Sequence, residues 1–332
     1  MKVFVTGATG CLGAHIAREL LEAGHEVRLL VRNPKMAQQY FAELGYTIND
    51  LVVADMTDTE TVRSGMNGCD AVVHAAAVID LDARNAEKTI NTNLKGFDSV
   101  VGTACELGIP KILYVSSMSV FFSPGARVIS ETSPLGTAND AYTRSKRLCE
   151  EKARELQHQG KPIIITYPSS IFGPDDPKLS ESNSALLKFV NLMVPKTLSG
   201  IQVVDVRDLA HFQRLLLEKP LHEPEKERYM LGGHFLPWGD VAGILHKATG
   251  LSIQSVYVPA WLFLILGRVF DFLRHFFTIE FPLSVESTRI VTSMPVSDSS
   301  HLQQVLGVQF RDVEETFRDT IAWLRKKNYL DK

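Results

Sequence analysis

Short apolar runs alternate with longer amphipathic stretches through the first half of the chain. The runs lie at residues 2–6, 26–31, 50–54, 70–76, 111–117 and 162–168. They are rich in Val, Ile and Leu and lack alternating polar positions, which is typical of parallel strands buried on both faces. The stretches 11–24 and 84–107 have helical spacing, and glycines mark their ends. This alternation predicts an α/β fold, a doubly wound parallel sheet with helices on both faces.

The regular alternation ends after Pro168, where prolines become frequent. A further strand-like run at 200–206 precedes another helical stretch. A chain of 332 residues is long enough for two packed units. We expect a sheet domain and a smaller, mixed C-terminal cap. We expect the sheet domain to span 1–170 and to include the later segment 200–233 as well. The cap would consist mainly of 171–199 and 234–332.

Composition narrows the class of protein. The formal charge is −3 and the isoelectric point is about 6.4. The protein therefore has no overall positive charge that would attract nucleic acid. The 4 cysteines include no C-x-x-C pair, and the 10 histidines show no metal-binding spacing. We therefore expect free thiols, no metal and a cytoplasmic location. The glycine loop begins at residue 7, within the stretch that an N-terminal signal peptide would occupy, so we expect no signal peptide.

The glycine loop places Gly7, Gly10 and Gly13 between the first strand and the first helix. Such a tight turn needs residues without Cβ where φ is positive or where another surface comes close. The N–H groups of the next helical turn then point at an anion, which is usually a dinucleotide pyrophosphate in a βαβ unit. A turn that only permits close packing of strand and helix is the alternative. The later strands of the sheet favour nucleotide binding.

Tyr142 and Lys146 lie four residues apart, so on a helix they share a face. A tyrosine with a pKa near ~10 is a poor acid or base at neutral pH, and a nearby ammonium is expected to lower that pKa. Ser117 ends the fifth strand, where open α/β sheets bind ligands, and its hydroxyl could stabilise a developing alkoxide. An ordinary surface pair is the alternative for Tyr142 and Lys146. The glycine loop and the serine favour catalysis.

Several motifs along the chain resemble the extended short-chain dehydrogenase/reductase family, of the NAD-dependent epimerase/dehydratase superfamily. They are TGATGCLG (6–13), ADM (54–56), HAAA (74–77), NLKG (93–96), VSSMSV (115–120), YTRSK (142–146) and YPSSIFGP (167–174). The likeness is nearest to the dihydroflavonol-reductase-like and 3β-hydroxysteroid-dehydrogenase-like branch. It is close over the first 170 or so residues and looser to about 235. It implies a Rossmann domain that binds NAD(P), capped by a substrate domain.

The same resemblance assigns catalytic roles. Ser117, Tyr142 and Lys146 match the catalytic serine, tyrosine and lysine of the family, and Ser117 fits that place better than Ser116. Asn93 matches an asparagine that holds a proton-relay water. A helix kink or a polar surface position is the alternative for Asn93.

Cofactor contacts are implied by the resemblance as well. They comprise the loop residues Gly7, Thr9, Gly10, Cys11, Leu12 and Gly13, then Arg32, Asp55, Met56, Ala75, Ala76, Ala77, Tyr142, Lys146, Pro168, Ser169 and Ser170. Asp55 and Met56 would meet the adenine, and Pro168 to Ser170 would lie beside the nicotinamide. Asp55 fits a helix cap equally well. We expect His74 to be a core histidine and Cys11 to fill space.

The end of the second strand bears on the choice of cofactor. An acidic residue there normally holds the ribose 2′-OH of NAD, whereas a 2′-phosphate needs a cation. This strand ends at Arg32 without a carboxylate. We therefore expect NADP(H) to be preferred, although stacking of Arg32 on the adenine would also accommodate NAD(H).

Together these features predict reversible hydride transfer between NADP(H) and a carbonyl or secondary alcohol. A nucleotide-sugar epimerase or dehydratase that retains NAD is one alternative. A non-catalytic protein that senses NADP(H) is another, and the presence of both Tyr142 and Lys146 argues against it.

The segment 258–277 bears on the substrate. Its apolar core is shorter than the ~20 residues of a membrane span, and charged residues interrupt the rest of the segment. One helical side collects Leu262, Ile265, Leu266, Val269, Phe270, Leu273 and Phe277. We expect that side to face the core of the cap. Trp261, Phe263 and Leu264 would then line an apolar substrate pocket or touch a membrane surface. We expect a bulky apolar substrate of steroid, flavonoid or long-chain type, and a homodimer is compatible with the sequence.

Overall fold

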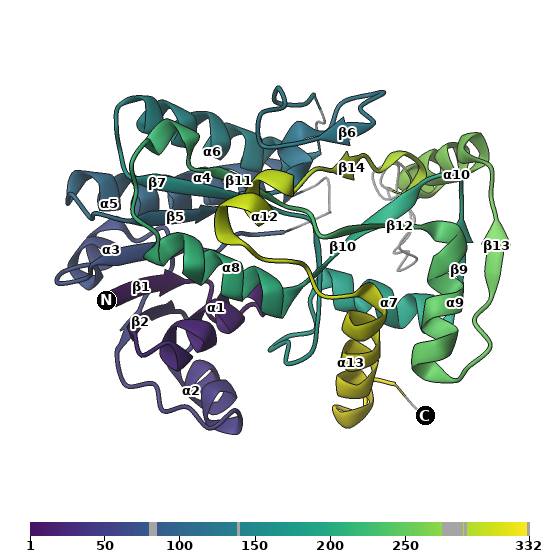
Figure 1. Cartoon of the computed structure of the whole chain (residues 1–332), viewed down its shortest axis with the longest axis horizontal. Helices are drawn as coiled ribbons and strands as arrows, with labels where there is room; N and C mark the ends of the chain where they lie inside the picture. Colours follow the sequence, from purple (N-terminus) through teal and green to yellow (C-terminus); the bar gives the residue numbers. More distant parts are fainter. Residues whose placement is uncertain (80–84, 138–139, 274–287, 289–290, 331–332) are drawn as a thin grey trace.

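A central parallel sheet lies between layers of helices, and a smaller lobe lies beside it (Figure 1). The computed structural model describes residues 1–79, 85–137, 140–273, 288 and 291–330, and for 271–273 only the backbone. The sheet has the order β11-β7-β5-β4-β1-β2-β3, and all its pairs are parallel. Its strands are β1 (Lys2–Thr6), β2 (Glu26–Val31), β3 (Leu51–Val53), β4 (Ala71–His74), β5 (Ile112–Val115), β7 (Ile163–Pro168) and β11 (Arg228–Leu231). The predicted doubly wound sheet is confirmed, and its strand order reverses between β1 and β4.

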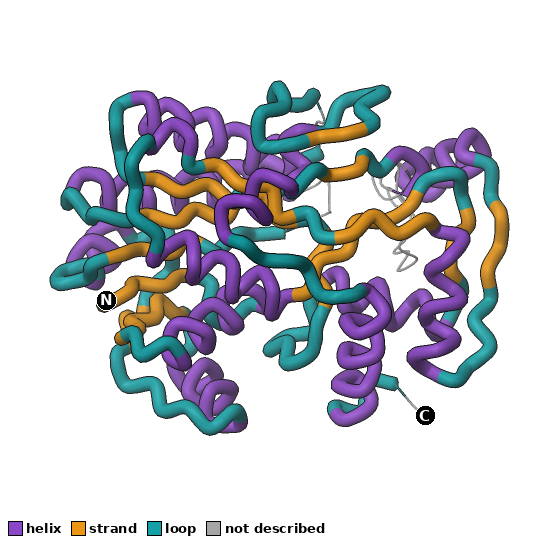
Figure 2. The backbone as a smooth tube through the Cα atoms, viewed as in Figure 1, coloured by secondary structure: helices purple, strands orange, loops and turns teal. Residues whose placement is uncertain are grey.

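Helices cover both faces of the sheet because its strands are apolar on both sides. Val3 and Val5 of β1 pack into one core cluster, and Phe4 between them packs into the other. The first face carries α1 (Cys11–Glu22), α2 (Pro34–Glu43), α8 (Val206–Glu218) and α12 (Ser300–Leu306). The second carries α3 (Thr59–Gly65), α4 (Ala86–Phe97), the π-helical turn η2 (Asp98–Gly102), α5 (Thr103–Glu106) and α6 (Ala141–His158). Figure 2 shows the strands between these two helical layers.

The smaller lobe has its own core, in which Leu186, Trp238 and Phe317 are buried. Its strands are β8 (Ser170–Phe172), β10 (Gly200–Asp205), β12 (His234–Pro237), β9 (Val194–Lys196) and β13 (Ser255–Tyr257). Its helices are α7 (Glu181–Asn191), α9 (Trp238–Thr249), α10 (Ala260–Leu273) and α13 (Val313–Lys326). The short pair β6 (Val128–Ile129) and β14 (Val296–Ser297) joins this side to the loop after β5. β10 pairs with β8 and β12, whereas α8 and β11, which come next in the chain, pack with the central sheet.

The orientation of α10 differs from the prediction. Ile265 and Val269, expected in the core, are 46% and 45% exposed, whereas Trp261, expected on another face, is 64% exposed. Phe263 and Leu264, expected on other faces, are partly buried. A helix that is apolar all round has no polar stripe to mark its outer side, so spacing alone could not orient it. Residues 274–277 of the predicted segment lie outside the described residues.

Two expected absences can be checked only within the described part of the chain. There, no helix combines the length and hydropathy that crossing a membrane requires. No group of three or more potential ligand side chains is arranged around a metal position in the same residues. Cys11, Cys69, Cys105 and Cys149 are free and buried.

Candidate active site

The predicted site residues come directly after strands that end at one edge of the central sheet. β4 and β5 end at His74 and Val115, earlier than the sequence suggested, so 75–77 and 116–117 lie in loops. The glycine loop comes after β1, and Ser169 comes after β7. In an open α/β sheet, this carboxyl edge at the point where strand order reverses is the usual place for a ligand.

At two positions of the loop, Gly7 and Gly13, a side chain would collide with the backbone of the protein, so packing alone requires glycine there. Gly7 has φ +81°, and a Cβ there would lie 2.7 Å from the backbone of Ala75 and Ala76. A Cβ on Gly13 would lie 2.3 Å from the carbonyl oxygen of Gly7, because α1 begins directly against the turn. A Cβ on Gly10 would come no closer than 3.4 Å to any atom considered, the Gly7 oxygen. Packing within the described chain therefore does not explain a glycine at position 10.

The start of α1 is suited to a phosphate group. Gly10 is the N-cap in extended conformation, no side chain of the described residues caps it, and the first turn carries no acidic residue. Backbone N–H groups at such a helix start and the helix dipole both favour an anion. The room at Gly10 and this uncapped turn fit a dinucleotide pyrophosphate.

Cys11, at the first position of α1, is buried. Burial, with Asp176 close by, raises the pKa of the Cys11 thiol well above its ordinary value. The thiol therefore stays protonated and unreactive at neutral pH, in keeping with the expectation that it fills space.

The structure brings Ser117, Tyr142 and Lys146 together. The Asp140 carboxylate accepts from the backbone N–H of Thr143 at 2.7 Å and starts α6 there. This start directs Tyr142 and Lys146 toward the end of β5, where the Lys146 ammonium donates to the carbonyl of Val115 at 2.8 Å.

Ser117 accepts from the backbone N–H of Ser119 at 3.2 Å, at the start of the 3₁₀ turn η3 (Met118–Phe121). Its hydroxyl also hydrogen-bonds Tyr142 and thereby favours the phenolate form of that tyrosine. The bond from Ser119 uses a lone pair of the serine oxygen, and the hydroxyl proton can be donated to Tyr142 or to a substrate oxygen.

The pKa values in this group are governed by burial. Burial raises the pKa of Tyr142 to about 12, and the hydrogen bond with Ser117 opposes that rise. The expected lowering by Lys146 is therefore wrong for this structure, in which the ammonium is engaged with the carbonyl of Val115. Burial also lowers the pKa of Lys146 to about 8, while Cys149 and Glu150 oppose that change.

Asn93 is buried and its amide is engaged on both sides. It accepts from the Val78 N–H at 2.8 Å and donates to the Val78 carbonyl at 3.0 Å and to Ser145 at 2.9 Å. Ser145 in turn donates to the carbonyl of Tyr142 at 2.7 Å. The alternative of a surface position for Asn93 is wrong, and the relay role stays a prediction. Ser145 was missed from the sequence, although it lies between Tyr142 and Lys146.

His74 is buried at the end of β4. Its Nδ1 lies 2.8 Å from the hydroxyl of Thr6, which also accepts from the Ala76 N–H. Burial, with Lys146 nearby, lowers the pKa of His74 to about 3, so it stays neutral as a core histidine.

Arg32 and Asp55 meet at the other end of the predicted cofactor path. Their side chains are 75% and 45% exposed, with 3.8 Å between guanidinium and carboxylate. Asp55 accepts from the N–H and hydroxyl of Thr57, whereas Asp58 caps α3. The alternative of Asp55 as the helix cap is therefore wrong, and its second oxygen faces Arg32.

The last predicted contacts come at the end of β7 and directly after it. Ser169 donates to the carbonyl of Gly232 at 2.8 Å, which ties the end of β7 to the end of β11. Pro168 is buried, and Ser170 begins β8 in the smaller lobe. This segment therefore links the carboxyl edge of the sheet to that lobe.

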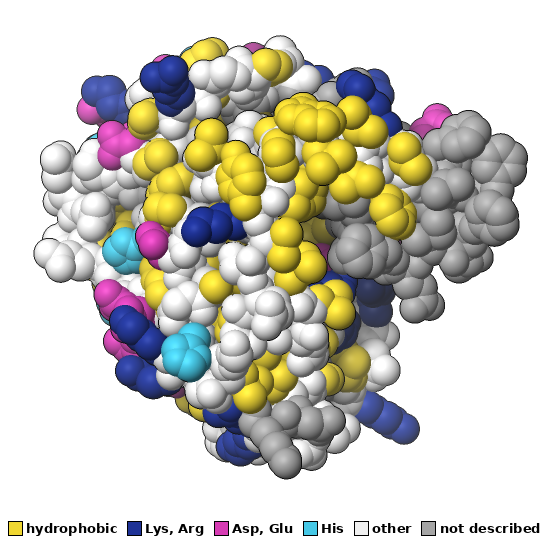
Figure 3. All heavy atoms as spheres, turned by 90° about the vertical axis from the view of Figure 1, so that its right-hand side faces the viewer, with side chains coloured by type: hydrophobic (Ala, Val, Ile, Leu, Met, Phe, Trp, Pro, Cys, Tyr) yellow, Lys and Arg dark blue, Asp and Glu magenta, His cyan; other side chains and the backbone are white. Residues whose placement is uncertain are grey.

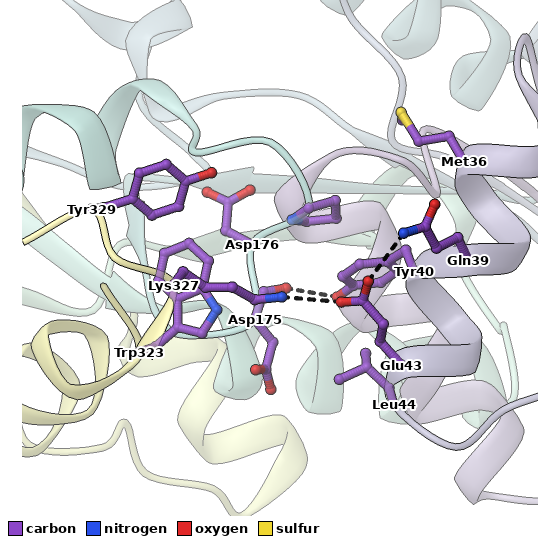
Figure 4. Close-up of a pocket in the computed structure, with 11 residues that line it drawn as sticks. Met36, Gln39, Tyr40, Glu43, Leu44, Asp175, Asp176, Trp323, Lys327 and Tyr329 are labelled. Atoms are coloured by element: carbon purple, nitrogen blue, oxygen red, sulfur yellow. Dashed lines mark hydrogen bonds and ion pairs between the residues drawn. The ribbon is translucent and has the colours of Figure 1, made fainter. Parts of the chain in front are cut away.

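A separate pocket of about 230 Å³ lies between α2, the loop after β8 and α13 (Figure 4). Lys327 and Glu43 form an ion pair across it at 3.0 Å, and Tyr40 donates to the carbonyl of Asp175. No residue of the predicted site lines it among those the structure describes. The pocket is therefore distinct from the candidate active site.

Comparison with known proteins bears on the family of the chain. Residues 3–232 match the model of the NAD dependent epimerase/dehydratase family. A Synechocystis protein provisionally named dihydroflavonol 4-reductase is 28% identical over 332 residues, covering 98% of this chain and 95% of that protein. Sterol demethylase protein B of Methylococcus capsulatus is 27% identical, covering 99% and 100%.

Solved structures share the fold along the whole chain. The crystal structure of gox2253 superimposes with a TM-score of 0.82 at 27% identity and covers 99% of each chain. A UDP-glucose-4-epimerase from Stenotrophomonas maltophila, solved with bound NAD and formylated UDP-arabinopyranose, has a TM-score of 0.78 at 19% identity, with 99% of each chain covered. At that identity the second likeness concerns the fold alone.

The glycine loop leads to a first testable prediction. Gly10→Ala should weaken NADPH binding at least about tenfold, or about 1.4 kcal/mol, because the methyl group occupies the phosphate cradle. Its free energy of unfolding should change by less than about 1 kcal/mol, since the protein has room for that methyl group. Gly13→Ala is the matched variant and should lose about 2 kcal/mol or more, because its Cβ meets the Gly7 backbone.

Fluorescence titration with NADPH and urea unfolding measure the two effects. Unchanged NADPH affinity in Gly10→Ala, or wild-type stability in Gly13→Ala, would contradict this account of the loop.

Proposed function

The chain belongs to the NAD dependent epimerase/dehydratase family, and from that premise we propose a specific activity for this oxidoreductase. We propose that it transfers hydride reversibly between NADP(H) and a carbonyl or secondary alcohol on a bulky apolar substrate. The observation that carries the proposal is the contact of the Ser117 and Tyr142 hydroxyls, with Tyr142 on the helix whose Lys146 ammonium is bonded to Val115 at the end of β5.

Tyr142 is the proposed proton donor in the direction of reduction. Its pKa of about 12 keeps the phenol protonated across the neutral range, so the proton is present when needed. Ser117 would donate a hydrogen bond to the same substrate oxygen and stabilise the negative charge that develops there. Bound nicotinamide would supply or accept the hydride.

Lys146 is proposed to position the cofactor beside Tyr142 rather than to lower the pKa of that phenol. The Lys146 ammonium is held to Val115 at 2.8 Å on the same face of α6 as Tyr142. Resemblance to the family assigns Lys146 a contact with the cofactor ribose.

The proposed cofactor path runs along the carboxyl edge of the sheet. The uncapped start of α1 would hold the pyrophosphate, and Asp55 and Met56 would meet the adenine. Arg32 would bind a 2′-phosphate, since its exposed guanidinium has a single carboxylate contact, at 3.8 Å, among the described residues. This supports a preference for NADP(H), while NAD(H) remains open if Arg32 stacks on the adenine instead.

The proposed substrate class rests on the composition of the cap and on relatives. The segment 258–270 carries one charged residue, Arg268, so it contains few groups that could bind the charged and polar parts of a nucleotide sugar. Two relatives that cover nearly the whole chain are named for a dihydroflavonol and for a sterol, both bulky and largely apolar. A membrane contact through 258–277 would suit such a substrate, and homodimer formation is compatible with the proposal.

The activity is tested by NADPH consumption with bulky apolar ketones of steroid, flavonoid and long-chain type. Tyr142→Phe should lower kcat/KM at least about a thousandfold, a size typical of losing a general acid. NADPH affinity should stay within about twofold of wild type, because the phenol oxygen is a small part of the cofactor site. Tyr46→Phe, which removes a hydroxyl bonded to Glu22 on α1, is the control and should keep full activity.

Activity that survives Tyr142→Phe would overturn the mechanism. Conversion of nucleotide sugars alone, without net consumption of free cofactor, would favour an epimerase that retains NAD. Tight NADPH binding without turnover of any carbonyl compound would favour a sensor protein.

The cofactor preference is tested separately by dissociation constants. NADPH should bind at least about tenfold more tightly than NADH. A hydrogen bond to a charged group contributes about 1.5–3 kcal/mol, and exposure of Arg32 to solvent reduces that contribution. Arg32→Ala should remove that preference and leave NADH affinity unchanged. Arg63→Ala, which removes an exposed arginine paired with Glu106, is the control. Equal affinities in the wild type, or tighter NADH, would contradict the proposal.

A further inference from the structure

An exposed apolar surface covers one side of the smaller lobe. We call it the α10 surface, and it consists of the exposed side chains Leu192, Met193, Leu198, Val256, Tyr257, Trp261, Ile265 and Val269. Figure 3 shows hydrophobic side chains gathered on this side of the molecule. Several are far from buried, with Leu198 95% and Trp261 64% exposed. A gathering of exposed apolar side chains of this kind often marks a binding surface.

The residues of the α10 surface come from elements that are adjacent in space. Trp261, Ile265 and Val269 recur every fourth residue and form one stripe along α10. Two residues separate β13 from α10, and β13 pairs in parallel with β9. Val258, between β13 and α10, also donates to the carbonyl of Lys196 at 3.1 Å.

Leu192, Met193 and Leu198 flank β9 on its two ends. Because β9 is bonded to β13 and β13 leads into α10, the segments that bear these exposed side chains are neighbours in the smaller lobe.

Two exposed cations, Lys196 and Arg268, lie among the residues of the α10 surface in the sequence. Residues 182–204 include Lys188 and Lys196 but no Asp or Glu, and residues 241–270 include Lys247 and Arg268 but no Asp or Glu. Exposed cations beside apolar side chains are complementary to a surface that is both apolar and anionic.

Aromatic residues add to this pattern. Trp261 and Tyr257 each combine an apolar ring with a polar group, and both are largely exposed. Such rings are favoured where hydrocarbon meets water. A second copy of the chain would bring the cations of two identical surfaces together, which disfavours that occupant.

We propose that the α10 surface docks the protein onto the interface of a membrane that contains anionic lipid. The apolar stripe of α10 and the ends of β9 enter the interface, and Lys196 and Arg268 face the headgroups. This proposal goes beyond the catalytic activity and does not depend on it, since docking needs neither cofactor nor substrate.

Flotation of the full chain with vesicles tests the proposal. Wild-type protein should bind phosphatidylcholine vesicles that contain phosphatidylserine, and bind pure phosphatidylcholine vesicles at least about tenfold more weakly, since each cation near the surface adds attraction. Trp261→Ser combined with Ile265→Ser should reduce binding to the anionic vesicles at least about tenfold. Lys196→Glu combined with Arg268→Glu should remove the preference for anionic vesicles.

Tryptophan fluorescence provides a second readout. Trp238 and Trp323 are buried and Trp261 is 64% exposed, so a blue shift on addition of vesicles reports on Trp261. Leu107→Ser combined with Val305→Ser changes exposed apolar residues elsewhere and is the matched control, which should bind like wild type. Circular dichroism and NADPH binding establish that each variant is folded.

Absence of vesicle binding by the wild type would overturn the proposal. So would binding that Trp261→Ser and Ile265→Ser leave unchanged. A dimer that these two substitutions dissociate in the absence of vesicles would identify a second copy as the occupant, which also overturns it.

Discussion

The buried ammonium of Lys146 is the constraint on which the arrangement of the candidate site depends. Lys146 is 5% exposed, and a charge so far removed from water is costly unless other groups compensate for the lost hydration. Compensation comes from the carbonyl of Val115 at 2.8 Å and from the ring of Tyr114, whose centre lies 5.4 Å from the ammonium. Both belong to β5, so the need to solvate one charge holds α6 against the strand that leads to Ser117.

A second buried group holds the same helix to the next strand. Glu150 is fully buried and accepts from the Tyr167 hydroxyl at 2.6 Å and from Arg154 at 2.8 Å. Tyr167 belongs to β7, and Glu150 lies one turn beyond Lys146 on α6. The carboxylate also opposes the lowering of the Lys146 pKa. The register of α6, and with it the meeting of Tyr142 and Ser117, is thus fixed by polar contacts to β5 and β7.

Much of the fold and of the candidate site could be predicted from the sequence because it depends on local patterns. The apolar strand runs, the loop around Gly7 and the spacing of Tyr142 and Lys146 each lie within a few residues of chain, and they predicted the sheet and the site edge. Tertiary burial is not local, so nothing in the sequence around Tyr142 indicated that its pKa is raised to about 12. The outer face of α10 was misjudged for a related reason, since Ile265 is as apolar as its partly buried neighbours.

The sequence also provided no means of assigning different roles to residues of the same type that lie close together in the chain. Asp55 and Asp58 both precede α3, and only the structure distinguishes the cap, Asp58, from the carboxylate that faces Arg32. Ser145 carries no motif of its own, yet it joins Asn93 to the carbonyl of Tyr142. Such links depend on which helices meet, here α4 and α6, and a single sequence does not contain that information.

The most direct test of this account is the pKa of Lys146 in the cofactor-free protein, measured by NMR of lysines labelled with ¹³C at Cε. Lys146→Arg identifies the resonance, which is missing from the spectrum of that variant. Because burial disfavours the ammonium, the account predicts a pKa of about 8. The ordinary lysine value is ~10.4. The unfolded chain then binds more protons between these two values, and this lysine makes stability rise with pH across that window. Titration at the ordinary value would show that the ammonium is hydrated, and would contradict the claim that its burial organises the site.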